Sequence, residues 1–222
     1  MRARPVWLCA LGLVVLPRLA LAALDAKDVV RKVQARYDAT RDFTADVTQD
    51  MTVASLGKTI TARGTVAFKK PGKMRWELNE GDPQVIVADG TTLWFYRPNE
   101  RQVLKAPFDA AFHSSAPISF LTGVGKITDD FDASLDASEA GGDDKLLHLT
   151  LVPRHEGTDV GRLRLTVSRE SFDIYGAEVF DPLGNVSRLR FDHLQRNVNV
   201  ADEKFVFEVP PGVDVISAPL KQ

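Results

Sequence analysis

The chain has 222 residues but only one cysteine, Cys9, so it cannot form an internal disulfide. It also has few long runs of apolar residues. Its longest such run, Val6 to Leu16, is shorter than the roughly 20 apolar residues that a membrane-spanning helix needs. No later segment is apolar enough to cross a bilayer. We therefore expect a soluble protein that is held together by its hydrophobic core alone.

The first 22 residues have the pattern of a secretory signal peptide. Arg2 and Arg4 precede the apolar run, and Ala20-Leu21-Ala22 supplies the small residues that a signal peptidase recognises. The alternative is a membrane anchor, which Arg18 next to the cleavage site would favour. Cys9 lies inside the segment to be removed. The pattern predicts residues 1–22 as a cleaved signal peptide, 23–222 as one domain, and export out of the cytoplasm.

Charge argues against a polyanionic partner. The whole chain has 28 basic and 30 acidic residues, and removal of three arginines with the signal peptide leaves it about five charges negative. A negative surface disfavours nucleic acid and anionic membranes.

Catalytic and metal-binding patterns are missing as well. The histidines have no metal-ligand spacing and the serines lack a nucleophile elbow. The paired aspartates, Asp129-Asp130 and Asp143-Asp144, are more typical of solvated turns than of a metal site. We therefore expect no catalytic residue, no metal and no cofactor, and we expect that the protein is not an enzyme.

Periodicity predicts one opening helix followed by strands. Apolar residues from Ala26 to Tyr37 recur at helical spacing, with Asp25 as a plausible N-cap. After Tyr37 the apolar residues alternate, as in Met74, Trp76 and Leu78, with turns at Gly57, Pro71-Gly72, Asp89-Gly90 and Gly184 and a last strand at Phe205 to Val209. About ten short strands at hairpin spacing predict an antiparallel barrel or a strongly curved sheet.

Two segments depart from simple alternation. Pro107 to Gly125 has no strand pattern, and Ile118, Phe120 and Leu121 within it could form a short apolar helical turn. Leu93 to Tyr96 has large side chains on both faces of one strand. That strand could be buried on both sides, or one of its faces could line a ligand cavity. Periodicity alone leaves both interpretations open.

The order of several short stretches resembles the outer-membrane lipoprotein carrier family, LolA, over most of the mature chain. These stretches are Phe43 with Gln49, Gly64 to Pro71 leading to Arg75-Trp76, Val87 to Tyr96, Pro98 with Gln102-Val103, and Phe205 to Val213. The resemblance implies a mainly β fold, an unclosed antiparallel barrel of about ten or eleven strands that a few short helices cover. It also implies an apolar cavity and no cofactor.

As a function, the resemblance implies a periplasmic carrier that binds the acyl chains of lipoproteins released from the inner membrane. An ATP-driven inner-membrane transporter would load it, and an outer-membrane receptor would receive the cargo from a monomeric carrier. We expect the cavity to be lined by apolar side chains on the strands and in the irregular segment: Val66, Phe68, Met74, Trp76, Trp94, Tyr96, Ile118, Phe120 and Leu121.

One position departs from the pattern of the family. The residue before Pro71 is typically an arginine that is thought to tie the covering helices to the barrel, and here it is Lys70. Lysine offers a point charge where arginine offers a planar fork. We predict that Lys70 is a latch that bonds to carbonyls of the 107–125 segment. The alternative is a lysine that extends into solvent.

Three other functions remain to be weighed. The same fold could carry or sense another lipid or a hydrophobic peptide. A periplasmic hydrolase would need a cluster of perturbed titratable groups, which the sequence does not offer. A purely structural module would fill its interior with side chains and leave no cavity.

Overall fold

The computed structural model describes residues 25–108, 126–136, 145–154 and 160–217. Helix α1 (Ala26–Asp38) opens this part of the chain, as the periodicity predicts. The side chain of Asp25 accepts a hydrogen bond from the backbone N–H of Lys27 at 3.2 Å, which confirms the predicted N-cap. The buried face of α1 carries Val29, Val30 and Val33.

Twelve described strands follow, where about ten were expected. They are β1 (Asp42–Val53), β2 (Lys58–Lys69), β3 (Lys73–Glu80), β4 (Gln84–Asp89), β5 (Thr92–Arg97), β6 (Gln102–Pro107), β7 (Phe131–Leu135), β8 (Leu146–Pro153), β9 (Arg162–Ser168), β10 (Ile174–Phe180), β11 (Val186–Arg196) and β12 (Asp214–Ser217). A short helix, α4 (Ile127–Asp130), precedes β7. Three 3-10 turns, η1 (Ala54–Leu56), η2 (Pro98–Glu100) and η4 (Asp202–Phe205), complete the described elements.

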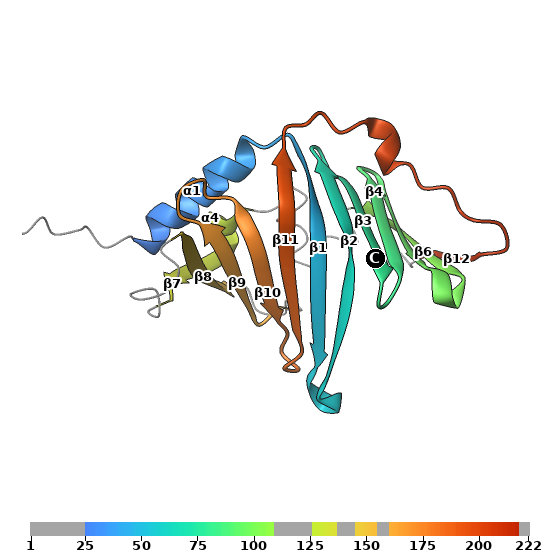
Figure 1. Ribbon diagram of the computed structural model, residues 1–222, viewed down its shortest axis with the longest axis horizontal. Helices are drawn as coiled ribbons and strands as arrows, with labels where there is room; N and C mark the ends of the chain where they lie inside the picture. The colour runs from blue at the N-terminus through green and yellow to red at the C-terminus, as the bar shows by residue number, and fades with distance from the viewer. Residues whose placement is uncertain (1–24, 109–125, 137–144, 155–159, 218–222) are drawn as a thin grey trace, which may run out of the picture.

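All twelve strands belong to one open sheet (Figure 1). Its order is β12-β6-β5-β4-β3-β2-β1-β11-β10-β9-β8-β7, so the two ends of the sheet are β12 and β7 and the barrel is not closed. Every neighbouring pair is antiparallel except β12 with β6. The predicted fold class, an unclosed antiparallel sheet with a few short helices, is confirmed.

The register defines two faces of this sheet. Paired residues of neighbouring strands point to the same side, so Phe43, Phe68 and Met74 share a face with Ala88 and Leu93. We call this the inner face, and the opposite one the outer face. Helix α1 packs against the inner face of β7 to β10, at one end of the sheet (Figure 1).

The inner face carries two apolar clusters. One joins α1 and α4 to β7–β10 and includes Val29, Val33, Ile127, Leu149 and Leu165, each no more than 2% exposed. The other lies on β1–β4 and β11, with Phe108 at the end of β6 packed against it. Leu189 on β11 packs against both clusters, so the two cores meet there.

The outer face is covered in part by the segment 197–213, which we call the C-terminal strap (Figure 1). Phe205 is 1% exposed and packs on Ala67 and Val200. The carboxylate of Asp42 accepts the backbone N–H groups of Val198 and Asn199 at 2.8 and 3.1 Å. The predicted final strand at Phe205 to Val209 is wrong, because this stretch is a 3-10 turn followed by extended chain that pairs with no strand.

Within the described residues, no helix has both the length and the apolar character to cross a membrane. The same residues contain no cluster of three or more histidine, cysteine, aspartate or glutamate side chains that could hold a metal ion.

Candidate functional site

Four of the predicted cavity residues meet on the inner face of β2 and β3. Val66 pairs with Trp76 and Phe68 with Met74, which places all four side chains on one side of the hairpin. Phe68 stacks on Phe43 of β1 with ring centroids 4.7 Å apart, and Trp76 meets the edge of Phe191 of β11 at 6.2 Å. The hairpin therefore presents a continuous apolar and aromatic surface toward the middle of the sheet.

These four side chains are themselves almost fully buried, at 1 to 8% exposure. The accessible part of the inner face lies beside them. Phe43, Ile86 and Leu93 are only partly buried against the same cluster, and Phe95 is half-buried in register with Ile86. Leu104 follows at 36% exposure on β6. A ligand that reaches this face would touch these residues first.

Trp94 and Tyr96 lie on the other side of the sheet, so their predicted place in a common cavity with Met74 and Trp76 is corrected. Trp94 pairs with Val87 and Tyr96 with Val85, which are outer-face positions of β4. Both rings lie 6.1 Å from the ring of Phe207, in the C-terminal strap. Strand β5 is thus apolar on both faces because the strap covers its outer side.

The predicted residues Ile118, Phe120 and Leu121 lie outside the described part of the chain. The neighbouring Phe108 is 6% exposed and packs on the β2–β3 cluster. Membership of these three residues in a lipid-binding cavity stays a prediction.

Lys70 points at the last turn of α1 and not into solvent. Its ammonium donates to the backbone carbonyl of Tyr37 at 2.6 Å and lies 4.0 Å from the centroid of the Tyr37 ring. Burial lowers the pKa of Lys70, and the nearby carboxylate of Asp38 partly offsets this. A cation at the carbonyl end of a helix is also favoured by the helix dipole. The described carbonyl that Lys70 holds is therefore in α1 and not in residues 107–108, while the rest of the predicted 107–125 segment lies outside the described residues.

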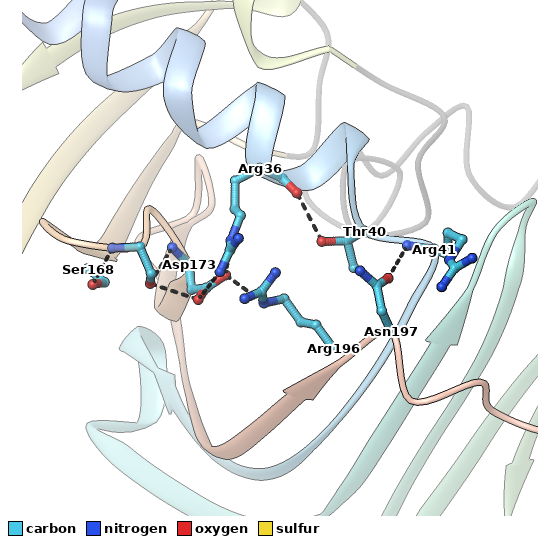
Figure 2. A network of polar contacts seen from close by, with 8 residues as sticks. Arg36, Thr40, Arg41, Ser168, Asp173, Arg196 and Asn197 are labelled. Atoms are coloured by element: carbon cyan, nitrogen blue, oxygen red, sulfur yellow. Dashed lines mark hydrogen bonds and ion pairs between the residues drawn. The ribbon is translucent and has the colours of Figure 1, made fainter.

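A second polar tie holds α1 from the other side (Figure 2). The guanidinium of Arg36 donates to both oxygens of Asp173, at 2.9 and 3.2 Å, and Nε of Arg196 lies 2.9 Å from the same carboxylate. Asp173 is only 8% exposed, so the pair of arginines replaces the water that its charge has lost. The Thr40 hydroxyl donates to the Arg36 carbonyl at 2.9 Å and closes the end of the helix.

Between these two ties lies a cavity of about 50 Å³. Its apolar walls come from α1, β1, the β9–β10 turn and β11, and its polar wall is the cluster of Arg36, Asp173 and Arg196. The apolar side chains are Val33, Tyr37, Phe43, Phe172, Ile174, Phe191 and Leu194. Pockets that enclose a drug-sized ligand are roughly 300–1,000 Å³, so this cavity by itself is too small for one.

The chemistry of this region favours binding over catalysis. Apolar side chains dominate it, and its charged groups are engaged in ties between elements. Such a surface can shelter hydrocarbon, at roughly 0.8 kcal/mol for each buried methylene.

Sequence reasoning missed the accessible inner-face residues Ile86, Leu93 and Phe95. The signal that could have found them is the register of the β4–β5 hairpin, whose turn at Asp89-Gly90 was recognised. That turn pairs Ala88 with Leu93, which assigns odd positions of β5 to the inner face. The arginine–aspartate cluster was also missed, because Arg36 and Asp173 are 137 residues apart and carry no local pattern.

Comparison with known proteins agrees with this fold. The family model "Outer membrane lipoprotein carrier protein LolA" matches residues 38–208. A protein of Methylobacillus flagellatus named outer-membrane lipoprotein carrier protein is 31% identical over 85% of this chain and 89% of its own length. One of Bordetella avium with the same name is 33% identical over 94% of this chain and 95% of its own length.

A solved structure shows the same fold at lower identity. The crystal structure of an uncharacterized conserved protein from Thermus thermophilus has a TM-score of 0.54 and 15% identity, and it covers 87% of this chain and 99% of its own. At that identity the likeness concerns the fold alone.

Proposed function

Because the chain belongs to the LolA family of outer-membrane lipoprotein carriers, we propose that it is a carrier of lipoproteins in the periplasm. The acyl chains of the cargo lie against the inner face of β1–β6. The observation that carries this proposal is the partly exposed apolar surface of Phe43, Ile86, Leu93 and Phe95 beside a buried aromatic cluster. An apolar surface of this kind suits hydrocarbon and no polar substrate.

We propose that α1 shifts when cargo is loaded. The cavity of about 50 Å³ beside α1 is too small for several acyl chains. Two polar ties resist that movement, Lys70 to the Tyr37 carbonyl and Arg36 to Asp173. We propose Lys70 as the latch on this side of α1, in the place where the family usually has arginine.

The energetics favour a partial shelter. Burial of one long acyl chain is worth on the order of 10 kcal/mol at roughly 0.8 kcal/mol per methylene, so full burial of several chains would prevent release. A carrier with a half-exposed inner face and a latch of a few kcal/mol can both hold and release its cargo. We propose that an ATP-driven inner-membrane transporter supplies the work of loading and that an outer-membrane receptor takes the cargo.

The test is to purify the exported, tagged protein from the periplasm and to identify what it carries by mass spectrometry. N-terminal sequencing of the same sample checks the proposed cleavage after Ala22. Acylated lipoprotein N-termini in the bound fraction support the proposal. A bound fraction that contains other lipids and no lipoprotein contradicts it and favours a carrier of another lipid.

A further inference from the structure

The cluster of Arg36, Asp173 and Arg196 has more positive than negative charge. Asp173 is the one carboxylate that lines the cavity among the described residues, while two guanidinium groups share it. Lys32 adds a third cation nearby, 4.8 Å from the centroid of the Phe172 ring, and that ring also lines the cavity. On α1, the carboxylate of Asp38 does not line the cavity and accepts a hydrogen bond from the side chain of Gln34. The polar wall of the cavity therefore has room for one more negative charge.

Asp173 cannot satisfy all the donors that face it. One of its oxygens takes Nε of Arg36 and lies 2.9 Å from Nε of Arg196. The other takes Nη2 of Arg36 and the hydroxyl of Ser171, at 3.2 and 2.7 Å. Within the described part of the chain, Nε is the only side-chain nitrogen of Arg196 with a partner, so the terminal nitrogens of its guanidinium remain available. The side chain of Arg196 is 25% exposed, which leaves it reachable from solvent.

The rest of the cavity is apolar. Val33, Phe172 and Ile174 surround it on one side, and Phe43, Phe191 and Leu194 lie on the other. Phe43 and Leu194 also pack against the β2–β3 cluster, so apolar side chains join the wall of the cavity to the inner face. A guanidinium at one end and apolar side chains at the other match a single alkyl chain with an anionic head group.

We propose that the Arg36–Asp173–Arg196 cluster binds the anionic head of a free single-chain amphiphile, such as a fatty acid. The head accepts hydrogen bonds from the terminal nitrogens of Arg196. The first methylenes occupy the cavity beside α1, and the rest of the alkyl chain lies along the apolar side chains that lead to the inner face. This site goes beyond the carriage of lipoproteins, because an acyl chain that is attached through an ester or amide has no charge at its head. It also does not depend on that function, since it concerns the isolated protein and a free ligand.

The experiment is isothermal titration calorimetry of the purified protein with three C12 amphiphiles below their aggregation concentrations. Dodecanoate and dodecyl phosphate carry an anionic head, and dodecanol has the same chain without charge. We expect at least one anionic ligand to bind more than tenfold tighter than dodecanol, since charge-assisted bonds to a desolvated guanidinium are strong. The tighter of the two anions tells a carboxylate source from a phosphate source.

Variants locate the effect. Arg196→Gln should reduce the preference for the anionic head to less than threefold, and the matched control Arg190→Gln should keep it. Arg190 lies on the same strand but is exposed on the outer face, where it pairs with Asp192. Equal affinity for dodecanol and both anions, or an unchanged preference in Arg196→Gln, overturns the proposal. If Arg196→Gln does not fold, the wild-type comparison of charged and uncharged ligands still decides.

Discussion

The two halves of the inner face are built from the same kind of strand but have different roles. Strands β7–β10, which we call the packed half, bury Leu147, Leu149 and Leu151 to 1% exposure or less beneath α1. Strands β2–β6, the open half, bury Met74 and Trp76 but leave Ile86, Leu93 and Phe95 partly accessible. The buried side chains of the packed half stabilise the fold. The open half leaves apolar surface accessible, and a carrier of hydrocarbon needs such a surface to bind its cargo.

The largest expected difference between the halves is in stability. Leu149→Ala in the packed half should lower the free energy of unfolding by about 2–5 kcal/mol, because it empties a fully buried site. The matched change Leu93→Ala in the open half should lower it by less than about 2 kcal/mol and should reduce the bound acyl cargo. Chemical denaturation and quantification of co-purified lipid measure the two effects. A comparable loss of stability in both variants would erase the distinction between the halves.

The next prediction concerns the tie that holds α1 beside the open half. Lys70→Leu removes a bond to the Tyr37 carbonyl, and charge-assisted bonds of this kind are worth about 1.5–3 kcal/mol. We expect faster and greater uptake of an apolar fluorescent dye by the empty protein. Lys70→Arg should keep dye uptake at the level of the unaltered protein.

Lys58→Leu is the control for that experiment, because Lys58 lies at the exposed start of β2, the strand that Lys70 directly follows. Dye uptake that is equal in the Lys70→Leu and Lys58→Leu variants would show that Lys70 does not restrain α1.

A smaller effect separates the two faces of β5. Phe207→Ala removes the strap ring that lies over Trp94 and Tyr96, and should cost about 1 kcal/mol of unfolding free energy. The acyl load should stay normal, because the change is on the outer face. If this variant lost its lipid but unfolded with the same free energy as the unaltered protein, Trp94 and Tyr96 would belong to the binding surface.

The smallest effect lies on the outer face of β11, at the boundary of the halves. The carboxylate of Asp46, 2.7 Å from the imidazole, raises the pKa of His193 above its usual 6.5. Protonated His193 therefore stabilises the fold fully below pH 6.5, and this contribution is lost as the pH rises through the raised value. The advantage in thermal unfolding of the wild type over His193→Gln should be slightly larger at about pH 6 than at about pH 8.5. Asp46→Asn should abolish this difference.

Sequence patterns predicted much of the fold because each rests on local physics. The helical period and the Asp25 cap located α1, and alternation with turn residues located the hairpins around Met74 and Trp76. The predicted final strand was wrong, because Phe205, Phe207 and Val209 alternate as in a strand but belong to the C-terminal strap on the outer face. Alternation records burial on one side, and it cannot tell a strand from an extended segment that packs without a partner.

The candidate site was less accessible to the sequence. Met74 suited an adaptable cavity wall, yet at 1% exposure it belongs to the hydrophobic core. Leu93 and Trp94 are both large and apolar, and only the pairing with β4 assigns them to opposite faces. The tie between Arg36 and Asp173 depends on long-range packing that no spacing in the chain encodes.

The central claim is that cargo lies on the inner face of the open half, and site-specific photocrosslinking tests it most directly. A photoreactive phenylalanine derivative is placed at Leu93 in one variant and at Trp94 in the other, and each is loaded with an acylated lipoprotein and irradiated. These neighbours point to opposite faces of β5. The account predicts a crosslinked adduct from position 93 and none from position 94. Efficient crosslinking from position 94 with none from position 93 would contradict it.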